Sequence, residues 1–158
     1  MIEMVAAFVV LGLIAAQAPA LPPAIPAIDA APFMGRWTCH GRFVRSGRPL
    51  DALVSIQRGD IDGTLVVDHR DISPGTYHSS EIWSFKSPGA RAAIVDATGM
   101  RWFEGRSDGA ALLFTRDAEG RPLEQFAYRP SSGGLTIDWS YRGSDGTMAL
   151  GDTLSCKR

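Results

Sequence analysis

The fold of this chain is decided by the stretch GRWTCHGRF, Gly35–Phe43, and by the stretch DTLSCKR, Asp152–Arg158, near the other end. Both stretches alternate polar with apolar residues, the pattern of a half-buried β-strand. Each carries one of the two cysteines of the chain, Cys39 and Cys156. If these cysteines pair, the first and last strands are neighbours, and a meander whose ends meet is a closed β-barrel.

Pairing of the cysteines depends on the compartment in which the protein folds. In an oxidising compartment two thiols on adjacent strands form a disulfide, whereas in the cytosol they stay reduced and behave as small apolar side chains. Two buried free cysteines are therefore the alternative. We expect a disulfide between Cys39 and Cys156, which would close most of the chain into one loop.

The composition is that of a single globular domain. The chain has 158 residues, of which 45% are hydrophobic and 21% charged, enough for one domain with its own core. Its 16 basic and 17 acidic residues are interspersed and give a formal net charge of -1. Because there is no basic stripe or acidic block, we expect no nucleic-acid partner.

An apolar run, Met4–Ala16, lies close to the start of the chain. It is too short to span a bilayer and is typical of the hydrophobic region of a signal peptide, which we place at residues 1–18. No Lys or Arg precedes the run, so a retained apolar helix is the alternative. We expect a periplasmic or secreted protein that meets the membrane only during export.

Proline recurs through residues 19–32, which predicts an extended Ala/Pro-rich linker rather than a helix. Residues 33–158 form the predicted domain. Turn signals rich in Gly, Ser and Asp, such as Ser131–Gly134 and Ser144–Gly146, recur there at the spacing of a sandwich or barrel. No window sustains a helical period. The prediction is an all-β, antiparallel, up-and-down barrel of eight to ten strands.

Several predicted strands have one apolar and one polar face, as an antiparallel barrel in water requires. An outer-membrane barrel would instead show a lipid-facing apolar band with aromatic girdles. The predicted apolar faces comprise Leu50, Ala52, Val54 and Ile56; Leu135, Ile137, Trp139 and Tyr141; and Met148, Leu150, Leu154 and Cys156.

The tripeptide Gly35–Trp37 resembles the G-x-W signature of lipocalins and related calycin barrels. The resemblance implies that Trp37 plugs one end of the barrel under a basic residue of the last strand, either Lys157 or Arg158. It also implies a calyx for a small apolar molecule. The chain lacks the second lipocalin motif and a C-terminal helix, and its ten hairpin-linked strands are more similar to nitrobindin-type barrels. Their haem chemistry does not transfer, because no His lies beyond His78.

The candidate ligand-binding residues begin with one strand on which Tyr77, Ser79, Glu81, Trp83 and Phe85 share a face. If the aromatic rings point inward, the carboxylate and hydroxyl do as well. Aromatic walls with a few polar groups are typical of a small-molecule pocket. We therefore predict that Tyr77, Glu81 and Trp83 contact a ligand.

The alternative for Glu81 is a place at the barrel rim, or an ion pair with an Arg such as Arg101. Trp102 and Trp139 complete the predicted ligand contacts, although tryptophans are core residues first. Either face of the strand that carries Trp102 could point inward, because its neighbour Phe103 lies on the opposite face and is also aromatic.

The remaining chemistry is sparse. His40, His69 and His78 show no metal-ligand spacing and are expected to be exposed, so we predict no metal and no cofactor. No G-x-S-x-G motif or phosphate-binding loop is present. Catalysis would have to come from dispersed carboxylates such as Glu81 and Glu104, and we expect no enzyme.

Two functions remain. The first is an exported barrel that binds a small apolar or amphipathic ligand in its interior. The alternative is a protein-interaction module, such as an inhibitor of a secreted enzyme that inserts the Pro-rich segment at residues 19–32 into its partner, where proline would lower the ordering cost.

Overall fold

The computed structural model of the protein describes residues 28–72, 74–85, 89–118 and 120–158. The predicted signal peptide and residues 19–27 of the predicted linker lie outside this part. Ile28 and Ala30, which the sequence places in the linker, pack against the core. In the described part of the chain, no helix could cross a lipid bilayer.

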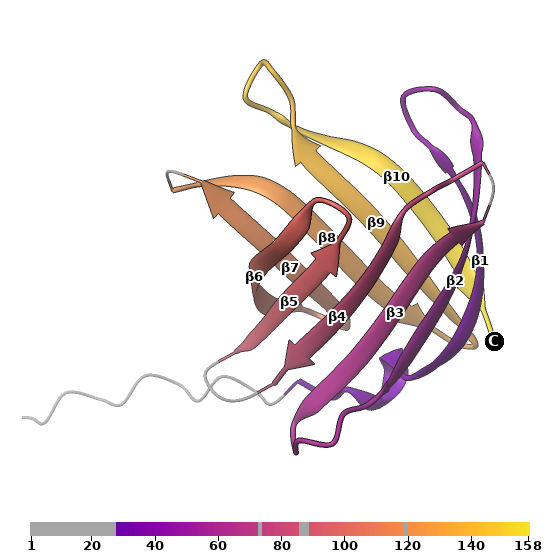
Figure 1. The fold of residues 1–158 in the computed structure, drawn as a ribbon, viewed down its shortest axis with the longest axis vertical. Coiled ribbons are helices and arrows are strands. Elements are labelled where there is room, and N and C mark those ends of the chain that lie inside the picture. Colours follow the sequence, from indigo (N-terminus) through magenta and orange to yellow (C-terminus); the bar gives the residue numbers. More distant parts are fainter. Residues whose placement is uncertain (1–27, 73, 86–88, 119) are drawn as a thin grey trace, which may run out of the picture.

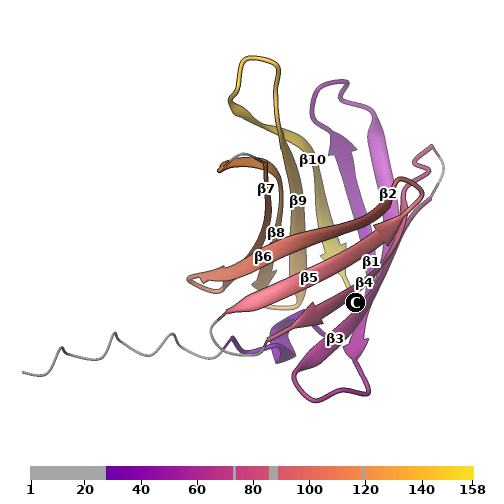
Figure 2. The ribbon, with the colours of Figure 1, turned by 60° about the vertical axis from the view of Figure 1, so that its left-hand side comes forward.

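Ten antiparallel strands close into one up-and-down barrel (Figures 1 and 2). A short 3-10 helix, η1 (Ala31–Phe33), precedes them. The strands are β1 (Gly35–Phe43), β2 (Pro49–Arg58), β3 (Thr64–Ile72), β4 (His78–Ser84), β5 (Ala90–Asp96), β6 (Gly99–Asp108), β7 (Ala111–Ala118), β8 (Arg121–Ser131), β9 (Gly134–Arg142) and β10 (Met148–Lys157). The predicted fold class is confirmed, with the strand number at the upper end of the expected range.

Closure occurs where β1 pairs with β10. Cys39 lies directly opposite Cys156 in this ladder, and the two form a disulfide. Both side chains are buried in the barrel interior. The predicted bond between the first and last strands is therefore confirmed.

The same seam depends on Gly41, which faces Leu154. A Cβ atom at this position would lie 1.8 Å from the backbone oxygen of Thr153. That distance is far inside van der Waals contact, and the obstacle is backbone, which cannot rotate away. Only glycine allows β1 and β10 to approach this closely.

One end of the barrel is sealed. Trp37 is only 2% exposed, and its indole Nε1 donates a hydrogen bond to the Phe33 carbonyl of η1 at 3.0 Å. The Arg158 guanidinium lies 4.7 Å from the Trp37 ring centroid and donates to the Met34 carbonyl. At Gly35, a Cβ would lie 3.2 Å from Arg158 Nε. These contacts have the form that the G-x-W resemblance implies, with Arg158 rather than Lys157 over the ring.

The predicted alternation holds on β2 and β9, whose inward faces are those expected from the sequence. On β10 it fails at one point. The ladder with β9 shifts register between Leu150 and Asp152, which leaves Gly151 as an extra residue. Such a bulge reverses the faces of the residues before it. Leu150 and Met148 are therefore 41% and 40% exposed, and the prediction that they share the inner face with Leu154 was wrong.

The half of the barrel next to Trp37 is filled by large side chains. The Trp83 ring packs 4.6 Å from Tyr128 and 4.9 Å from Phe114, measured between centroids. All three side chains are essentially fully buried. This layer is the floor on which the open half of the barrel stands.

We expect the disulfide to stabilise the fold mainly through the unfolded chain, because it joins residues 117 positions apart. Replacing both Cys39 and Cys156 by Ala should lower the free energy of unfolding by about 4 kcal/mol. Urea unfolding of the oxidised protein and the variant measures this difference. The reduced protein is the control and should match the variant, whereas equal midpoints for variant and oxidised protein would contradict the prediction.

Gly41→Ala should destabilise the barrel by about 3 kcal/mol or more, because the new methyl group meets the Thr153 backbone and β1 must separate from β10. The matched control is Arg42→Ala, whose side chain is exposed on the outer face of the same strand. Hydrogen exchange should show loss of protection along the β1–β10 ladder in Gly41→Ala alone. Unchanged protection there would show that the seam tolerates a side chain.

Candidate ligand-binding site

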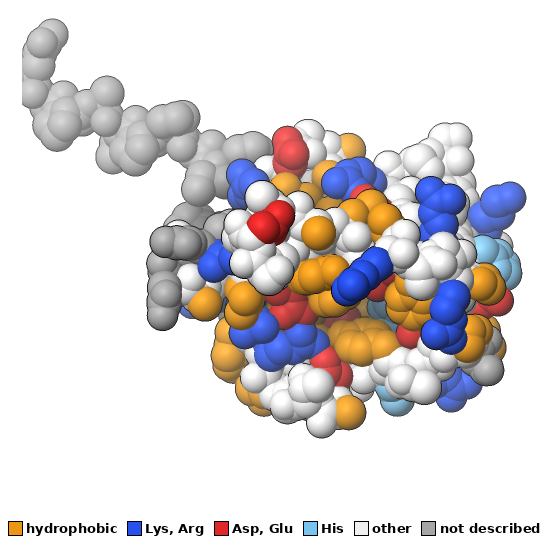
Figure 3. Space-filling model, turned by 90° about the horizontal axis from the view of Figure 1, so that it is seen from above, with side chains coloured by type: hydrophobic (Ala, Val, Ile, Leu, Met, Phe, Trp, Pro, Cys, Tyr) orange, Lys and Arg blue, Asp and Glu red, His pale blue; other side chains and the backbone are white. Residues whose placement is uncertain are grey.

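A cavity of about 310 Å³ occupies the end of the barrel opposite Trp37. Viewed from this end, the molecule is hollowed, with apolar surface visible in the hollow between charged side chains (Figure 3). The strand directions explain its position, because Phe43 ends β1 and Asp152 lies in the first half of β10. The apolar part of its lining consists of Phe43, Leu50, Phe126, Ile137 and Leu154, together with Trp139.

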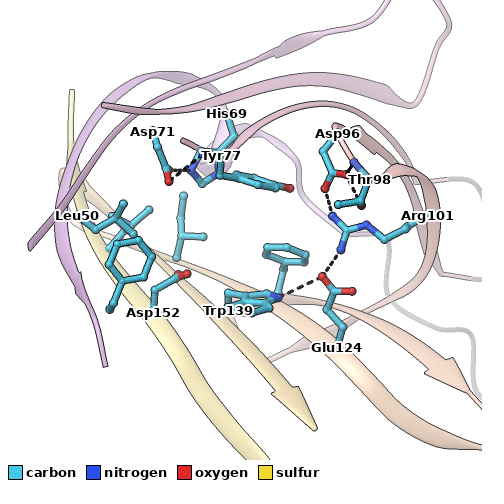
Figure 4. A pocket seen from close by; sticks show the side chains of 14 residues that line it. Leu50, His69, Asp71, Tyr77, Asp96, Thr98, Arg101, Glu124, Trp139 and Asp152 are labelled. Atoms are coloured by element: carbon cyan, nitrogen blue, oxygen red, sulfur yellow. Dashed lines mark hydrogen bonds and ion pairs between the residues drawn. The ribbon is translucent and has the colours of Figure 1, made fainter. Parts of the chain in front are cut away.

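One wall of the cavity holds an ion-pair network around Arg101 of β6 (Figure 4). The guanidinium donates hydrogen bonds to Asp96 of β5 and to Glu124 of β8. Desolvation opposes the charge of Asp96, but hydrogen bonds from Thr98 and the Arg101 charge outweigh it and lower the pKa of that carboxyl. Desolvation likewise opposes the charge of Arg101, yet the bond to Glu124 raises its pKa overall.

Glu124 extends this network to the next strands. Its second oxygen accepts hydrogen bonds from Arg116 of β7, at 3.1 Å from Nε and 2.9 Å from Nη2. The indole Nε1 of Trp139 donates to the first oxygen at 3.2 Å, which fixes that ring against the cavity. Two arginines thus face two carboxylates on this side, and their charges balance.

The opposite side of the cavity carries His69 and Asp71 of β3 and the adjoining Tyr77 (Figure 4). His69 Nε2 lies 3.4 Å from Asp71 Oδ1, but the two atoms are not aligned for a hydrogen bond. His69 Nε2 therefore has no hydrogen-bond partner among the described residues. Asp71 also accepts a 3.4 Å hydrogen bond from the Tyr77 backbone N–H. The His69 and Tyr77 rings meet edge to face at 5.3 Å.

The Tyr77 hydroxyl points toward the side of the cavity that holds Asp96 and Thr98 (Figure 4). Its Oη is buried and has no hydrogen-bond partner within the part of the chain that the structure describes. Burial raises the pKa of Tyr77 to about 12, so the phenol stays protonated at neutral pH. A neutral phenol can both donate a hydrogen bond to a ligand and accept one from it.

Asp152 of β10 is the other carboxylate on the Asp71 side. It is partly buried, and no hydrogen bond or ion pair joins it to another described side chain. Desolvation raises the pKa of Asp152 to about 6, opposed by His69 and reinforced by the negative charges of Asp71 and Asp138. The bulge that precedes it seats Gly151 under Trp139, where a Cβ would lie 2.3 Å from the indole ring.

Of the residues predicted to bind a ligand, Tyr77 and Trp139 line the cavity. Glu81 and Trp83 point inward as expected but lie in the packed layer rather than in the lining. Glu81 accepts hydrogen bonds from Ser79 Oγ at 2.9 Å and Trp83 Nε1 at 2.8 Å, and burial raises its pKa. Glu81 therefore pairs with its own strand instead of with Arg101.

Trp102 corrects the prediction most clearly. Phe103 takes the inward position on β6, so Trp102 faces outward and is 65% exposed. It cannot contact a ligand inside the barrel. Glu104 is also outside, in an exposed ion pair with Arg91. The pair of carboxylates considered for catalysis is thus divided by the barrel wall.

Sequence reasoning missed most of the polar lining, namely Asp71, Asp96, Arg101, Glu124 and Asp152. The two-residue period of a strand could have indicated each of them. Asp96, Arg101, Glu124 and Asp152 lie two positions from an inward apolar side chain of the same strand, and Asp71 lies two positions from His69. His69 itself was expected to be exposed but is 6% exposed, which corrects that prediction. His40 and His78 are exposed and contact Asp51 and Asp68.

Fold and site together define an all-antiparallel, ten-stranded closed β-barrel with one sealed end and one cavity-bearing end. This arrangement is compatible with a lipocalin-like barrel. No protein-family model matches the chain, and no curated protein matches it significantly in sequence. Across the described residues, no three His, Cys, Asp or Glu side chains are grouped as metal ligands.

The raised pKa of Asp152 predicts a specific pH dependence of stability. The folded protein holds this proton up to about pH 6, whereas the unfolded chain releases it near the ordinary value of 3.8. The contribution of Asp152 to the free energy of unfolding is therefore most favourable below pH 3.8, and it is lost as the pH rises through about 6. Between pH 4 and pH 7, the free energy of unfolding of Asp152→Asn should therefore rise by about 2 kcal/mol relative to that of the unsubstituted protein.

Urea unfolding of both proteins at the two pH values measures this difference. Asp145→Asn is a control of opposite sign, because hydrogen bonds from the Thr147 backbone and hydroxyl lower the pKa of that exposed carboxyl. A stability difference between Asp152→Asn and the unsubstituted protein that does not change with pH would contradict the predicted shift.

Proposed function

We propose that the protein binds a small amphipathic molecule in the cavity at the open end of the barrel. The observation that carries this proposal is a concave, mainly apolar space of about 310 Å³ at the end opposite the Trp37 seal. Pockets for small molecules start at roughly 300 Å³ and combine apolar walls with a few convergent polar groups. The cavity has both features.

The polar groups are placed to orient a ligand rather than to fill the cavity. Arg101 is held by carboxylates on both of its terminal nitrogens, and Trp139 is fixed by Glu124. Tyr77 Oη lacks a partner among the described residues and is available to a ligand. A molecule with an apolar body and one hydrogen-bonding end matches this distribution.

The proposed function is binding of the ligand without chemical conversion. Glu81 is enclosed in the packed layer, with hydrogen bonds to Ser79 and Trp83. Export to the periplasm or beyond is part of the proposal, and the buried disulfide is compatible with folding in an oxidising compartment. The protein-interaction alternative depends on residues 19–32, most of which lie outside the described part, and it stays a prediction.

Filling the cavity should abolish binding. Leu50 lines the cavity on β2 and is 2% exposed, so Leu50→Trp would place an indole in the space that a ligand needs. We expect the affinity for the apolar fluorophore N-phenyl-1-naphthylamine to fall by at least about tenfold, measured by its fluorescence enhancement.

The matched control is Leu53→Trp on the same strand, since Leu53 faces outward and is 42% exposed. This variant should bind the fluorophore as the unsubstituted protein does. Circular dichroism and the unfolding midpoint of each variant verify that the barrel is intact. If the unsubstituted protein fails to bind the fluorophore, or if Leu50→Trp binds it equally well, the cavity is not the ligand site.

A further inference from the structure

We propose that the cavity selects a cationic ligand, whose ammonium group lies between Asp71 and Asp152 while its apolar body contacts the aromatic walls. This inference rests on the ligand-binding function proposed above and specifies the chemical class of the ligand. Three features of the described cavity lead to it: an imbalance of charge, an unpartnered acceptor on His69 and an aromatic lining.

The two sides of the cavity differ in charge. On one side Arg101 and Arg116 are matched by Asp96 and Glu124. On the other side Asp71 and Asp152 face the cavity with His69 as their nearest basic group (Figure 4). Even a protonated His69 would leave one negative charge unmatched, so this side attracts a cation.

An anionic ligand has no equivalent place. Among the described residues that line the cavity, Arg101 is the only Arg or Lys, and both of its terminal nitrogens already bond to carboxylates. Its Nε lacks a partner among the described atoms, but the guanidinium charge is shared between Asp96 and Glu124. A carboxylate or sulfonate approaching Arg101 would meet these two negative groups at once, and like charges at short range are strongly unfavourable.

Acceptors for an ammonium group converge on the acidic side. The His69 side chain is 7% exposed, faces the cavity, and has no hydrogen-bond partner at Nε2 in the described structure. An ammonium group has three N–H donors, which the two carboxylates and His69 Nε2 could accept. The buried, unpartnered His69 Nε2 is an indication of a ligand that is independent of the charge count.

Aromatic rings surround the same space. Phe43, Tyr77, Phe126 and Trp139 all belong to the lining. Trp139 stacks on Tyr141 with centroids 5.0 Å apart, which holds the indole in place. Ring faces are electronegative and attract ammonium groups, most strongly where water is excluded. The aromatic lining therefore favours the same sign of ligand charge as Asp71 and Asp152.

The test compares three probes that share an indole body and differ in charge at pH 7.5: tryptamine, which is a cation, tryptophol, which is neutral, and indole-3-acetate, which is an anion. Isothermal titration calorimetry on the unsubstituted protein measures each affinity. Tryptamine should bind at least about tenfold more tightly than tryptophol, because a hydrogen bond to a charged partner contributes about 1.5–3 kcal/mol. Indole-3-acetate should bind most weakly.

Replacing one carboxylate tests whether its charge is responsible for the preference for a cation. Asp152→Asn should reduce the affinity for tryptamine about tenfold and leave that for tryptophol unchanged. Asp68→Asn is the matched control, because it removes a carboxylate from the exposed outer face of β3, where Asp68 contacts His78. It should change neither affinity. The comparison of the three probes on the unsubstituted protein needs no variant, so the test survives if Asp152→Asn fails to fold.

Proton linkage gives a second readout. The titratable groups that act on the Asp152 carboxyl are His69 and Asp71 on β3 and Asp138 on β9. Since tryptamine stays charged between pH 5 and pH 7.5, its affinity should fall at pH 5, where Asp152 gains a proton because its pKa is about 6. The affinity of tryptophol should not follow this change.

The outcomes separate the two proposals. If tryptophol or indole-3-acetate binds as tightly as tryptamine, the cation assignment is overturned while the ligand-binding function stands. The same holds if none of the indole probes binds but N-phenyl-1-naphthylamine does. If neither the indoles nor the fluorophore bind, the ligand-binding function fails together with the cation assignment.

Discussion

The contact between β1 and β10 is the constraint on which the rest of the structure depends. Side chains alternate between the two faces of a strand, so a slip of one residue at the seam would exchange inner and outer faces. The disulfide between Cys39 and Cys156 fixes the register, and Gly41 allows the two backbones to approach. With this register fixed, Asp152 and Leu154 on β10 can face the same interior as Phe43 on β1.

Strand number then explains why a cavity remains. Side chains just fill the interior of a barrel of about eight strands, and a barrel of ten strands is wider. The sealed half compensates with its largest residues, Trp37, Trp83, Phe114 and Tyr128, which are essentially fully buried. In the open half, the inward positions carry polar and charged groups together with apolar residues, and these do not close the space. The cavity therefore follows from barrel width and from where the bulky side chains are concentrated.

Sequence was sufficient for the features that depend on local alternation. The closed barrel and the disulfide were predicted from the two cysteines in the first and last strands of an exported chain. The inward direction of Glu81 and Trp83 follows from the two-residue period of a strand. Alternation alone could not choose between Trp102 and Phe103, because both neighbours are aromatic and either could serve as the core residue. It also could not foresee the bulge at Gly151, since one extra residue in a strand leaves the pattern on each side intact.

The polar lining was harder to predict for a different reason. Arg101 on β6 meets Asp96 on β5 and Glu124 on β8. An ion-pair network of this kind is a property of the closed barrel, whereas the sequence shows only single charged residues at inward positions. Glu81 illustrates the same limit, because the sequence suggested Arg101 as its partner while the fold supplies Ser79 and Trp83.

Asp71 and Asp152, which share His69 as their nearest basic group, show why the site differs from an ordinary core. Removing a carboxylate from water costs free energy, and an ion pair or hydrogen bonds must offset that cost. For Asp96 the offset outweighs the cost and its pKa is lowered, whereas for Asp152 the attraction of His69 is too small and the pKa is raised to about 6. A structure selected for stability alone would place an apolar or paired side chain at that position. A negative group that the fold leaves unmatched inside an aromatic cavity is instead the arrangement that gains most from a cation supplied from outside, because the ligand then provides the counter-charge that the protein lacks.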